Sequence, residues 1–264
     1  MGKLITFWSP YSGHGMVTSS LCAVAGGLAL QYPACRIAIS HTETDDLSLA
    51  EKLDAREKSN RKVALYENLG IHALKMYIRK MELTDEIIEK CGVPLPMKSI
   101  FFYPNISTSG SDKRLLFQIL TQQLKHSYDI VLLDLASENR DEAVLFMKEA
   151  DLAIVMLSQE PAYVEQFIRE GLAYLEQIKY GFIFGGSLSA SKYNCKFYKK
   201  KMEIGNRILG EICRNTGFFD AMCEGKTLEF FLRNQMVVKN EENYEFICQA
   251  KKTAECVGQK INLI

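Results

Sequence analysis

The chain has 264 residues, of which 47% are hydrophobic and 24% charged, and its 32 basic residues balance 32 acidic ones. This composition is typical of a globular protein with a sizeable core and excludes a collagen-like or disordered chain. Because the formal net charge is zero, no global field attracts the chain to nucleic acid or to an anionic membrane. Any such contact requires a local basic patch.

Apolar runs typical of buried strands alternate with helical patterns along the chain. The strand candidates are 4–8, 36–40, 99–103, 130–134, 152–157 and 181–184, and the helical patterns cover 17–32, 64–80, 84–91, 112–126, 141–150 and 162–179. Continuous apolar strands separated by helices predict a mostly parallel central sheet covered by helices on both faces, which is a three-layer α/β fold. Because the chain contains no Pro/Gly/Ser-rich linker, we expect a single domain over residues 1–264.

Cysteine usage and hydropathy indicate a cytoplasmic protein. The eight cysteines form no CxxC pair and no Cys/His spacing suited to zinc, which favours reduced thiols. No run reaches the roughly 18 apolar residues that a membrane-spanning helix needs. The short apolar run near the N-terminus ends at Pro10, which argues against a signal peptide. We therefore expect no transmembrane segment.

The segment after the first predicted strand has the layout of a phosphate-binding loop. Residues 9–20 are Ser-Pro-Tyr-Ser-Gly-His-Gly-Met-Val-Thr-Ser-Ser, and a helical pattern follows. A strand, a glycine-bearing turn and a helix N-terminus together present backbone N–H groups to phosphate. Gly13 and Gly15 allow close approach, but no lysine stands beside the hydroxyl residues Thr18 and Ser19.

The loop can be aligned with such a motif in two registers. With Gly15 as the last loop glycine, Met16 takes the place of the lysine and Val17 that of the Mg²⁺-binding hydroxyl. With Met16 in the glycine place, Val17 replaces the lysine and Thr18 is able to coordinate Mg²⁺. The second register is preferred because it retains the metal ligand. A tight strand-to-helix turn that binds nothing is the alternative.

Other polar residues follow the predicted strands. The apolar run YDIVLL ends in Asp134, the form of a Walker B motif, whose carboxylate holds Mg²⁺ through water beside the loop. After the second strand, Glu43 or Asp45 is either a further ligand or part of a solvated loop. His14 and His41 are both able to approach the phosphate site.

Two segments raise the question of partners. The predicted helix at 194–207 carries Lys196, Lys199, Lys200 and Lys201, which form either a solvated face or a contact for DNA or acidic lipid. The C-terminal segment 244–264 has apolar residues at roughly helical spacing. We expect it to pack on the domain rather than to bind a membrane.

Together these motifs resemble the ParA/MinD family of P-loop ATPases over nearly the whole chain. The family loop KGGxGKTT and its helix ending NLAxxLA correspond to SGHGMVTS at 12–19 and AVAGGLA at 23–29. YDIVLLD at 128–134 resembles the family's YDYVIID, and EADLAIVM at 149–156 resembles AADxVLIV. The pattern VLGxIPxD…A…GK is matched by ILGEIC at 208–213, then by Asp220-Ala221 and Glu224-Gly225-Lys226.

The resemblance implies a P-loop NTPase-like fold, binding of ATP and Mg²⁺, and a homodimer formed across the nucleotide face. The nucleotide-binding residues that it implies are Ser12, Gly13, His14, Gly15, Met16, Val17, Thr18 and Ser19. For Mg²⁺ it implies Thr18, together with Asp134 through water.

The departures from the family pattern concern its charges. Ser12 replaces a lysine that reaches across the family dimer, and Val17 replaces a lysine that binds phosphate in its own subunit. Cys213 replaces the proline of the adenine-side loop, and Gly185-Gly186 stand where an Asn usually contacts the base. Lysine-poor loops also occur in the TadZ/CpaE branch, which positions pilus-assembly machinery at the cell pole. Loss of both lysines predicts ATP binding with weak or no hydrolysis.

The first hypothesis is therefore an atypical nucleotide-binding protein that acts with protein partners as a positioning, partition or pilus-assembly factor. Such a protein is cytoplasmic, with recruitment to a cell pole or membrane surface as a further expectation. Two alternatives stay open. One is an active ATPase whose lysines are replaced from elsewhere, for instance by Lys192 or Lys196 of a second copy. The other is a nucleotide-free scaffold that binds DNA or protein.

Overall fold

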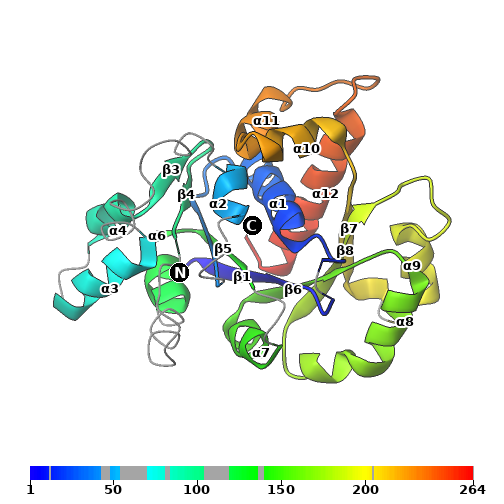
Figure 1. Cartoon of the computed structure of the whole chain (residues 1–264), viewed down its shortest axis with the longest axis horizontal. Helices are drawn as coiled ribbons and strands as arrows, with labels where there is room; N and C mark the ends of the chain where they lie inside the picture. Colours follow the sequence, from blue (N-terminus) through cyan, green and yellow to red (C-terminus); the bar gives the residue numbers. More distant parts are fainter. Residues whose placement is uncertain are drawn as a thin grey trace.

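A central sheet with helices on both faces forms the structure, a computed structural model that describes residues 1–11, 13–42, 48–53, 70–80, 84–103, 119–135, 140–203 and 205–263 (Figure 1). The strands are β1 (Lys3–Trp8), β2 (Ile37–His41), β3 (Val93–Leu95), β4 (Ser99–Phe101), β5 (Ile130–Asp134), β6 (Leu152–Leu157), β7 (Tyr180–Ser187) and β8 (Ile208–Cys213). They form one eight-stranded sheet in the order β3-β4-β2-β5-β1-β6-β7-β8. Among the strands of the described residues, only β3 and β4 pair antiparallel, so the predicted three-layer, mostly parallel α/β fold is confirmed.

The helices of the described residues divide between the two faces. On one face lie α1 (Val17–Gln31), α2 (Ser48–Leu53), α10 (Thr216–Cys223), α11 (Thr227–Arg233) and α12 (Tyr244–Lys260). On the other lie α3 (Gly70–Lys80), α4 (Asp85–Cys91), the π-helical turn η2 (Ile119–Leu124), α6 (Lys125–Ser127), α7 (Arg140–Glu149), α8 (Pro161–Glu170) and α9 (Cys195–Lys201). Short 3₁₀ turns, η3 (Leu172–Leu175) and η4 (Gly205–Arg207), complete the set.

The central strands bury both of their faces. In β1, Ile5 and Phe7 pack into the core under α1 and α12, whereas Leu4 and Trp8 pack into the core under α7 and α8. Each strand therefore needs apolar residues at consecutive positions, which explains the continuous runs in the sequence.

Helix α1 is enclosed along most of its length. Every residue from Ser20 to Ala29 is buried, and two glycines let other elements approach its backbone. A Cβ atom at Gly26 would lie 2.1 Å from the ring of Phe231, and one at Gly27 would lie 2.6 Å from the carbonyl oxygen of Ala250 in α12. The C-terminal helix thus packs on the domain, as its apolar spacing predicts.

Several predicted elements differ from those observed. The helix expected over 162–179 ends at Glu170, and Gly171 and η3 follow. A Cβ atom at Gly171 would lie 2.2 Å from the ring of Phe167, so glycine, a poor helix former, stands at this boundary. The helix expected over 194–207 ends at Lys201. Strands β3 and β8 are absent from the strand candidates. The short edge strand β3 contains Pro94, a residue without a backbone N–H.

Parts of two predicted helices, 64–69 and 112–118, lie outside the described residues. Among the residues that are described, no helix is long and apolar enough to cross a membrane. All eight cysteines lie within the described residues and are free.

The contact between Gly27 and α12 yields a stability prediction. We expect Gly27→Val to lower the free energy of unfolding by about 1–3 kcal/mol, because the backbone of α12 must move to admit the side chain. Urea denaturation measures the change. Gln31→Val introduces the same residue at an exposed position of α1 and serves as the control. Equal stability of the two variants would contradict the described packing.

Candidate functional site

The loop between β1 and α1 closes tightly at its start. Ser9 is buried, its hydroxyl donates to the carbonyl oxygen of Tyr11 at 3.1 Å, and it accepts from the Tyr11 N–H at 3.3 Å. A Cβ atom at Gly15 would lie 2.3 Å from Ser9 Oγ, so only glycine fits there. Gly13 has a φ of 74°, in the left-handed region that favours glycine. Ser12 lies outside the described residues.

Met16 occupies the conformation of a loop glycine. Its backbone is left-handed, with φ 48° and ψ 46°, and it is the N-cap of α1, whose first bond runs from the Ser20 N–H to the Met16 carbonyl at 2.9 Å. The helix begins at Val17, so Thr18 is its second residue. This geometry agrees with the register that places Met16 at the glycine, Val17 at the lysine and Thr18 at the hydroxyl.

Thr18 and Asp134 meet at the carboxyl edge of the sheet. The Thr18 hydroxyl donates to Asp134 Oδ2 at 2.7 Å, across 116 positions of sequence. Asp134 is the last residue of β5 and lies in register with Phe7 of β1 on one side and with His41 of β2 on the other. The two expected metal ligands are therefore brought together, and His41 lies beside them. Glu43 and Asp45 fall outside the described residues.

The interior next to this pair is strongly desolvated. Cys22 lies one turn along α1 from Thr18, and burial raises the pKa of its thiol to about 12. The thiol is therefore neutral at physiological pH, and it packs as an apolar side chain. Val17 also packs against this core, so the position that carries a lysine in the family faces apolar surroundings.

His14 contacts α8. Its Nε2 lies 3.2 Å from the hydroxyl oxygen of Tyr163, and the two ring centroids are 4.5 Å apart. Tyr11 contacts the same ring, with centroids 5.1 Å apart. The His14 N–H donates to the Tyr11 carbonyl at 3.3 Å. These three side chains form an aromatic clasp that attaches the loop to α8.

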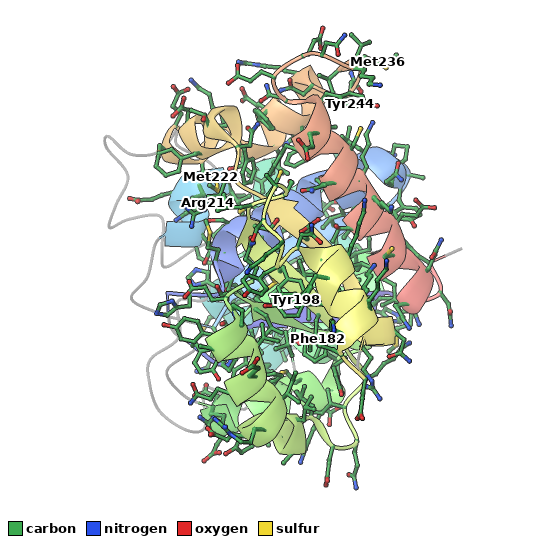
Figure 2. The ribbon with its side chains drawn as sticks, turned by 90° about the vertical axis from the view of Figure 1, so that its right-hand side faces the viewer. Phe182, Tyr198, Arg214, Met222, Met236 and Tyr244 are labelled. Atoms are coloured by element: carbon green, nitrogen blue, oxygen red, sulfur yellow. The ribbon has the colours of Figure 1, made fainter. Side chains whose placement is uncertain are left out.

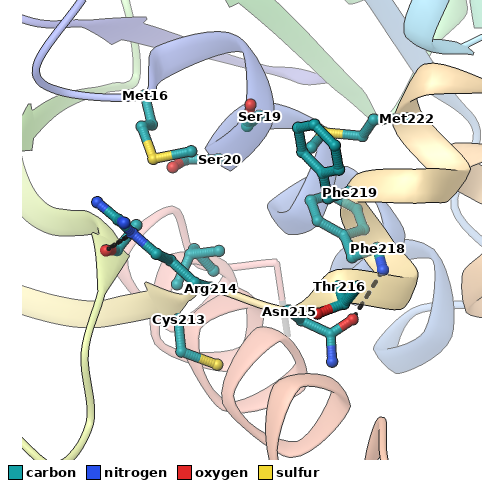
Figure 3. A pocket seen from close by; sticks show the side chains of 12 residues that line it. Met16, Ser19, Ser20, Cys213, Arg214, Asn215, Thr216, Phe218, Phe219 and Met222 are labelled. Carbon is teal, nitrogen blue, oxygen red and sulfur yellow. Dashed lines mark hydrogen bonds between the residues drawn. The ribbon is translucent and has the colours of Figure 1, made fainter.

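A pocket of about 430 Å³ opens beside the start of α1 (Figure 3). The first turn of α1 supplies Met16, Ser19 and Ser20 to its wall. The segment after β8 and helix α10 supply the opposite wall, which includes Cys213, Arg214, Asn215, Phe218, Phe219 and Met222. One wall of the pocket therefore lies at a helix N-terminus, whose first N–H groups have no intrahelical partner, and the opposite wall is apolar and aromatic.

Asn215 and Cys213 shape this wall. The Asn215 side chain caps α10 by accepting from the Phe218 N–H at 2.7 Å. The Cys213 N–H donates to Gln249 of α12 at 3.1 Å, and burial raises the pKa of the Cys213 thiol to about 11. The Cys213 thiol is therefore neutral and unreactive at physiological pH.

Gly186 allows the loop to approach the end of β7. Its φ is 61°, and a Cβ atom there would lie 2.2 Å from the sulfur of Met16. A Cβ atom at Gly185 would lie 2.3 Å from the carbonyl oxygen of Gly15. Gly185 and Gly186 thus leave room for the loop. They stand at positions where the family resemblance implies an Asn.

Lys3 and the lysines of helix α9 lie away from this site. Lys3 is at the opposite edge of the sheet, where its Nζ lies 3.6 Å from Asp151. Helix α9, on the side of the molecule that Figure 2 shows, buries Cys195 and Tyr198 and exposes Lys196, Lys199, Lys200 and Lys201. Lys192 lies over the ring of Tyr193, 4.8 Å from its centroid.

The sequence patterns did not indicate Tyr163 or Arg214. Tyr163 lies near the start of a helix whose pattern predicts only amphipathic packing, and Arg214 follows a strand that was missing from the candidates. The one signal for Arg214 was its place after the family-like ILGEIC segment.

The chain is similar to known proteins in its fold. No family model matches the sequence, and no curated protein matches it. A plasmid partition protein of Borrelia burgdorferi B31, bound to AMPPNP, has a TM-score of 0.65 and 14% identity over 98% of this chain and 100% of that chain. MinD of Pyrococcus horikoshii OT3, complexed with Mg-ADP, has a TM-score of 0.64 and 14% identity over 100% and 98% of the two chains. A chain of the MinC:MinD cell division complex of Aquifex aeolicus has a TM-score of 0.62 and 14% identity over 98% and 96%.

These similarities extend over nearly the full length of each chain. The protein therefore has the fold of MinD and of ParA-type plasmid partition proteins. At 14% identity, the function of the site has to be argued from its own residues.

The left-handed backbone of Met16 can be tested by substitution. We expect Met16→Gly to change the free energy of unfolding by less than about 1 kcal/mol, because relief of strain offsets the flexibility of glycine. Met16→Val should lower it by about 2 kcal/mol, since a β-branched residue fits φ 48° poorly. Urea denaturation measures both changes. Met236→Val, at an 84% exposed position, is the control, and a Met16→Val variant as stable as the control would argue against this register.

Proposed function

We propose that this protein is a ParA/MinD-like nucleotide-binding protein that binds ATP with Mg²⁺ and hydrolyses it slowly or not at all. The observation that carries the proposal is the start of α1, where left-handed Met16 precedes Thr18 and Thr18 contacts Asp134 at 2.7 Å. In this arrangement a phosphate chain accepts from the N–H groups at the helix N-terminus. The Thr18 hydroxyl would coordinate Mg²⁺, and Asp134 would hold the ion through water.

The residues of the site fit a nucleotide. The first N–H groups of α1 have no intrahelical partner, and Ser19 lies with them on the pocket wall. Ser20 Oγ is buried and has no hydrogen-bond partner within the described part of the chain. The aromatic side of the pocket, with Phe218 and Phe219, offers an apolar surface for a base. When bound, Mg²⁺ supplies charge neutralisation to the phosphates.

The chain's own residues argue for binding more than for turnover. Val17 is half-buried against the apolar core and provides no cation, and His14 is engaged with Tyr163. Loss of a cation that stabilises transition-state charge costs on the order of 10³-fold or more in rate. The site therefore retains its backbone donors and its metal ligands but not the loop lysine whose charge accelerates hydrolysis.

The biological role follows by analogy with the similar structures. A plasmid partition protein and the MinC:MinD cell division complex share the fold. We place the protein with positioning or partition factors, acting as a nucleotide-dependent homodimer that recruits protein partners in the cytoplasm, at a cell pole or at a membrane surface. A pilus-assembly role of the TadZ/CpaE kind is the narrower form of this proposal.

Isothermal titration with ATP, in the presence of Mg²⁺ and in EDTA, tests the metal site. We expect Mg²⁺ to tighten ATP binding to the wild-type protein. Thr18→Ala and Asp134→Asn should each reduce the Mg²⁺-dependent gain in ATP affinity by about tenfold or more, because each variant loses one metal contact. Thr84→Ala removes a helix cap far from the site and serves as the matched control. No heat with ATP under either condition would refute nucleotide binding.

Phosphate release distinguishes the active-ATPase alternative. The proposal expects release by the wild-type protein to match that of Asp134→Ala. Release well above this control, rising with protein concentration, would favour lysines contributed by a second copy. Lys192→Ala and Lys196→Ala would then identify the contributing residue.

A second function, contact with DNA, is favoured by the exposed face of α9. Asn194 caps the helix, and Cys195 and Tyr198 face inward, with Tyr198 stacked on Phe184 at 4.9 Å between centroids. The lysines therefore project outward as a group. Such a group binds the phosphate backbone without reading sequence.

Salt-dependent DNA binding tests this second function. We expect duplex DNA to bind more weakly as salt rises, and substitution of Lys199–Lys201 by Ala to weaken binding and reduce the salt slope by about three. The control neutralises three exposed lysines on other elements, Lys148, Lys239 and Lys260. Equal losses from the two sets would show that total charge, and not α9, determines binding.

A further inference from the structure

Of the described residues that line the pocket beside the loop, Arg214 carries a positive charge, and the proposed metal site gives it no role. Arg214 follows β8, and its side chain extends along the pocket toward Met16, on the side opposite Phe219 (Figure 3). Its Nε donates to the carbonyl oxygen of Gly186 at 3.1 Å. This bond holds the Nε end of the guanidinium group at the pocket wall and uses none of the N–H groups on its two terminal nitrogens. Among the described residues, no carboxylate forms an ion pair with Arg214.

The same pocket joins this cation to the start of α1. Met16 and Ser19 belong to the first turn, where the helix dipole favours negative charge. Ser20 also lines the pocket, is only 1% exposed, and its Oγ has no hydrogen-bond partner in the part of the chain that the structure describes. Buried hydroxyls are normally satisfied, so this one indicates a polar ligand group.

The two sides of the pocket differ in chemistry. Arg214, Ser19 and Ser20 form a cationic and polar side, and Phe218 and Phe219 form an apolar one. A molecule with an aromatic base at one end and phosphate at the other matches both sides. An uncharged nucleoside would use the apolar side and leave Arg214 without a partner.

We propose that Arg214 binds the phosphate chain of the nucleotide and supplies, from the same chain, the positive charge that the loop lacks at Val17. The inference rests on the proposed function. A planar guanidinium donates to two phosphate oxygens at once, and the bond to Gly186 holds it ready to do so. Arg214 is thus a specificity-determining residue that selects nucleoside polyphosphates over nucleosides.

Isothermal titration of the full chain tests the inference, with MgATP and adenosine as probes. Arg214→Gln removes the charge but keeps an N–H donor for the Gly186 carbonyl. We expect it to weaken MgATP binding by about tenfold or more and to leave adenosine binding within about twofold. Arg214→Lys should recover only part of the loss. Arg207→Ala, at the opposite end of β8, removes the same charge from an exposed site and should change neither affinity.

Each outcome separates this inference from the proposed function. Wild-type affinity of Arg214→Gln for MgATP would overturn the role of Arg214 and leave nucleotide binding intact. Equal losses for MgATP and adenosine would also overturn it, because Arg214 would then only shape the base side of the pocket. A wild-type protein that binds no MgATP would refute the proposed function itself. Thermal unfolding of both Arg214 variants checks that they are folded. If Arg214→Gln is unstable, Arg214→Lys is used instead to compare the change in MgATP affinity with the change in adenosine affinity.

Discussion

The close packing of α1 against the sheet and against its neighbour α12 is the contact on which the site depends. Gly27 brings the backbone of α12 against α1, and every residue from Ser20 to Ala29 is buried. A helix held in this way cannot shift or rotate without opening both neighbours, since protein interiors are close-packed. Its first turn is therefore fixed at the carboxyl edge of the sheet, next to Asp134. The packing of α1 in the core, rather than the conformation of the loop, therefore determines the position of Thr18.

The charges of the site are arranged differently from those of a lysine-bearing loop. Val17 is half-buried against the core, and Arg214 on the pocket wall belongs to the segment after β8, far along the sequence from the loop. Helix N-termini bind anions through fixed dipoles, which require no additional side chain. An arginine hydrogen-bonded to a carbonyl adds charge with little loss of side-chain freedom. Under the proposed function, this combination favours retention of the bound nucleotide over its hydrolysis.

Local patterns predicted the central sheet well, and the reason is physical. Strands β5 and β6 have the predicted bounds, because a strand buried on both faces must be apolar at every position. Strand β3 has only three residues and one of them is Pro94, so it carries no such signal. The α-helix ends at Glu170, before Gly171, and apolar spacing alone does not reveal this end because the amphipathic pattern continues past it.

The candidate site was predictable only in part, for a similar reason. The loop and Asp134 follow adjacent parallel strands, and the carboxyl ends of such strands meet at one edge, so their proximity could be expected. The clasp between His14 and Tyr163 spans 149 positions, and its geometry arises from tertiary packing. The pocket likewise joins Met16 to Arg214 from two distant segments. Neither leaves a periodic pattern in the sequence.

The proline in β3 has a consequence for how copies of this protein can associate. Strand β3 is the last strand at one end of the sheet, and an added strand would need hydrogen-bond donors along its free side. Pro94, at the centre of these three residues, has none to offer. Growth of the sheet from chain to chain is thereby discouraged at this border.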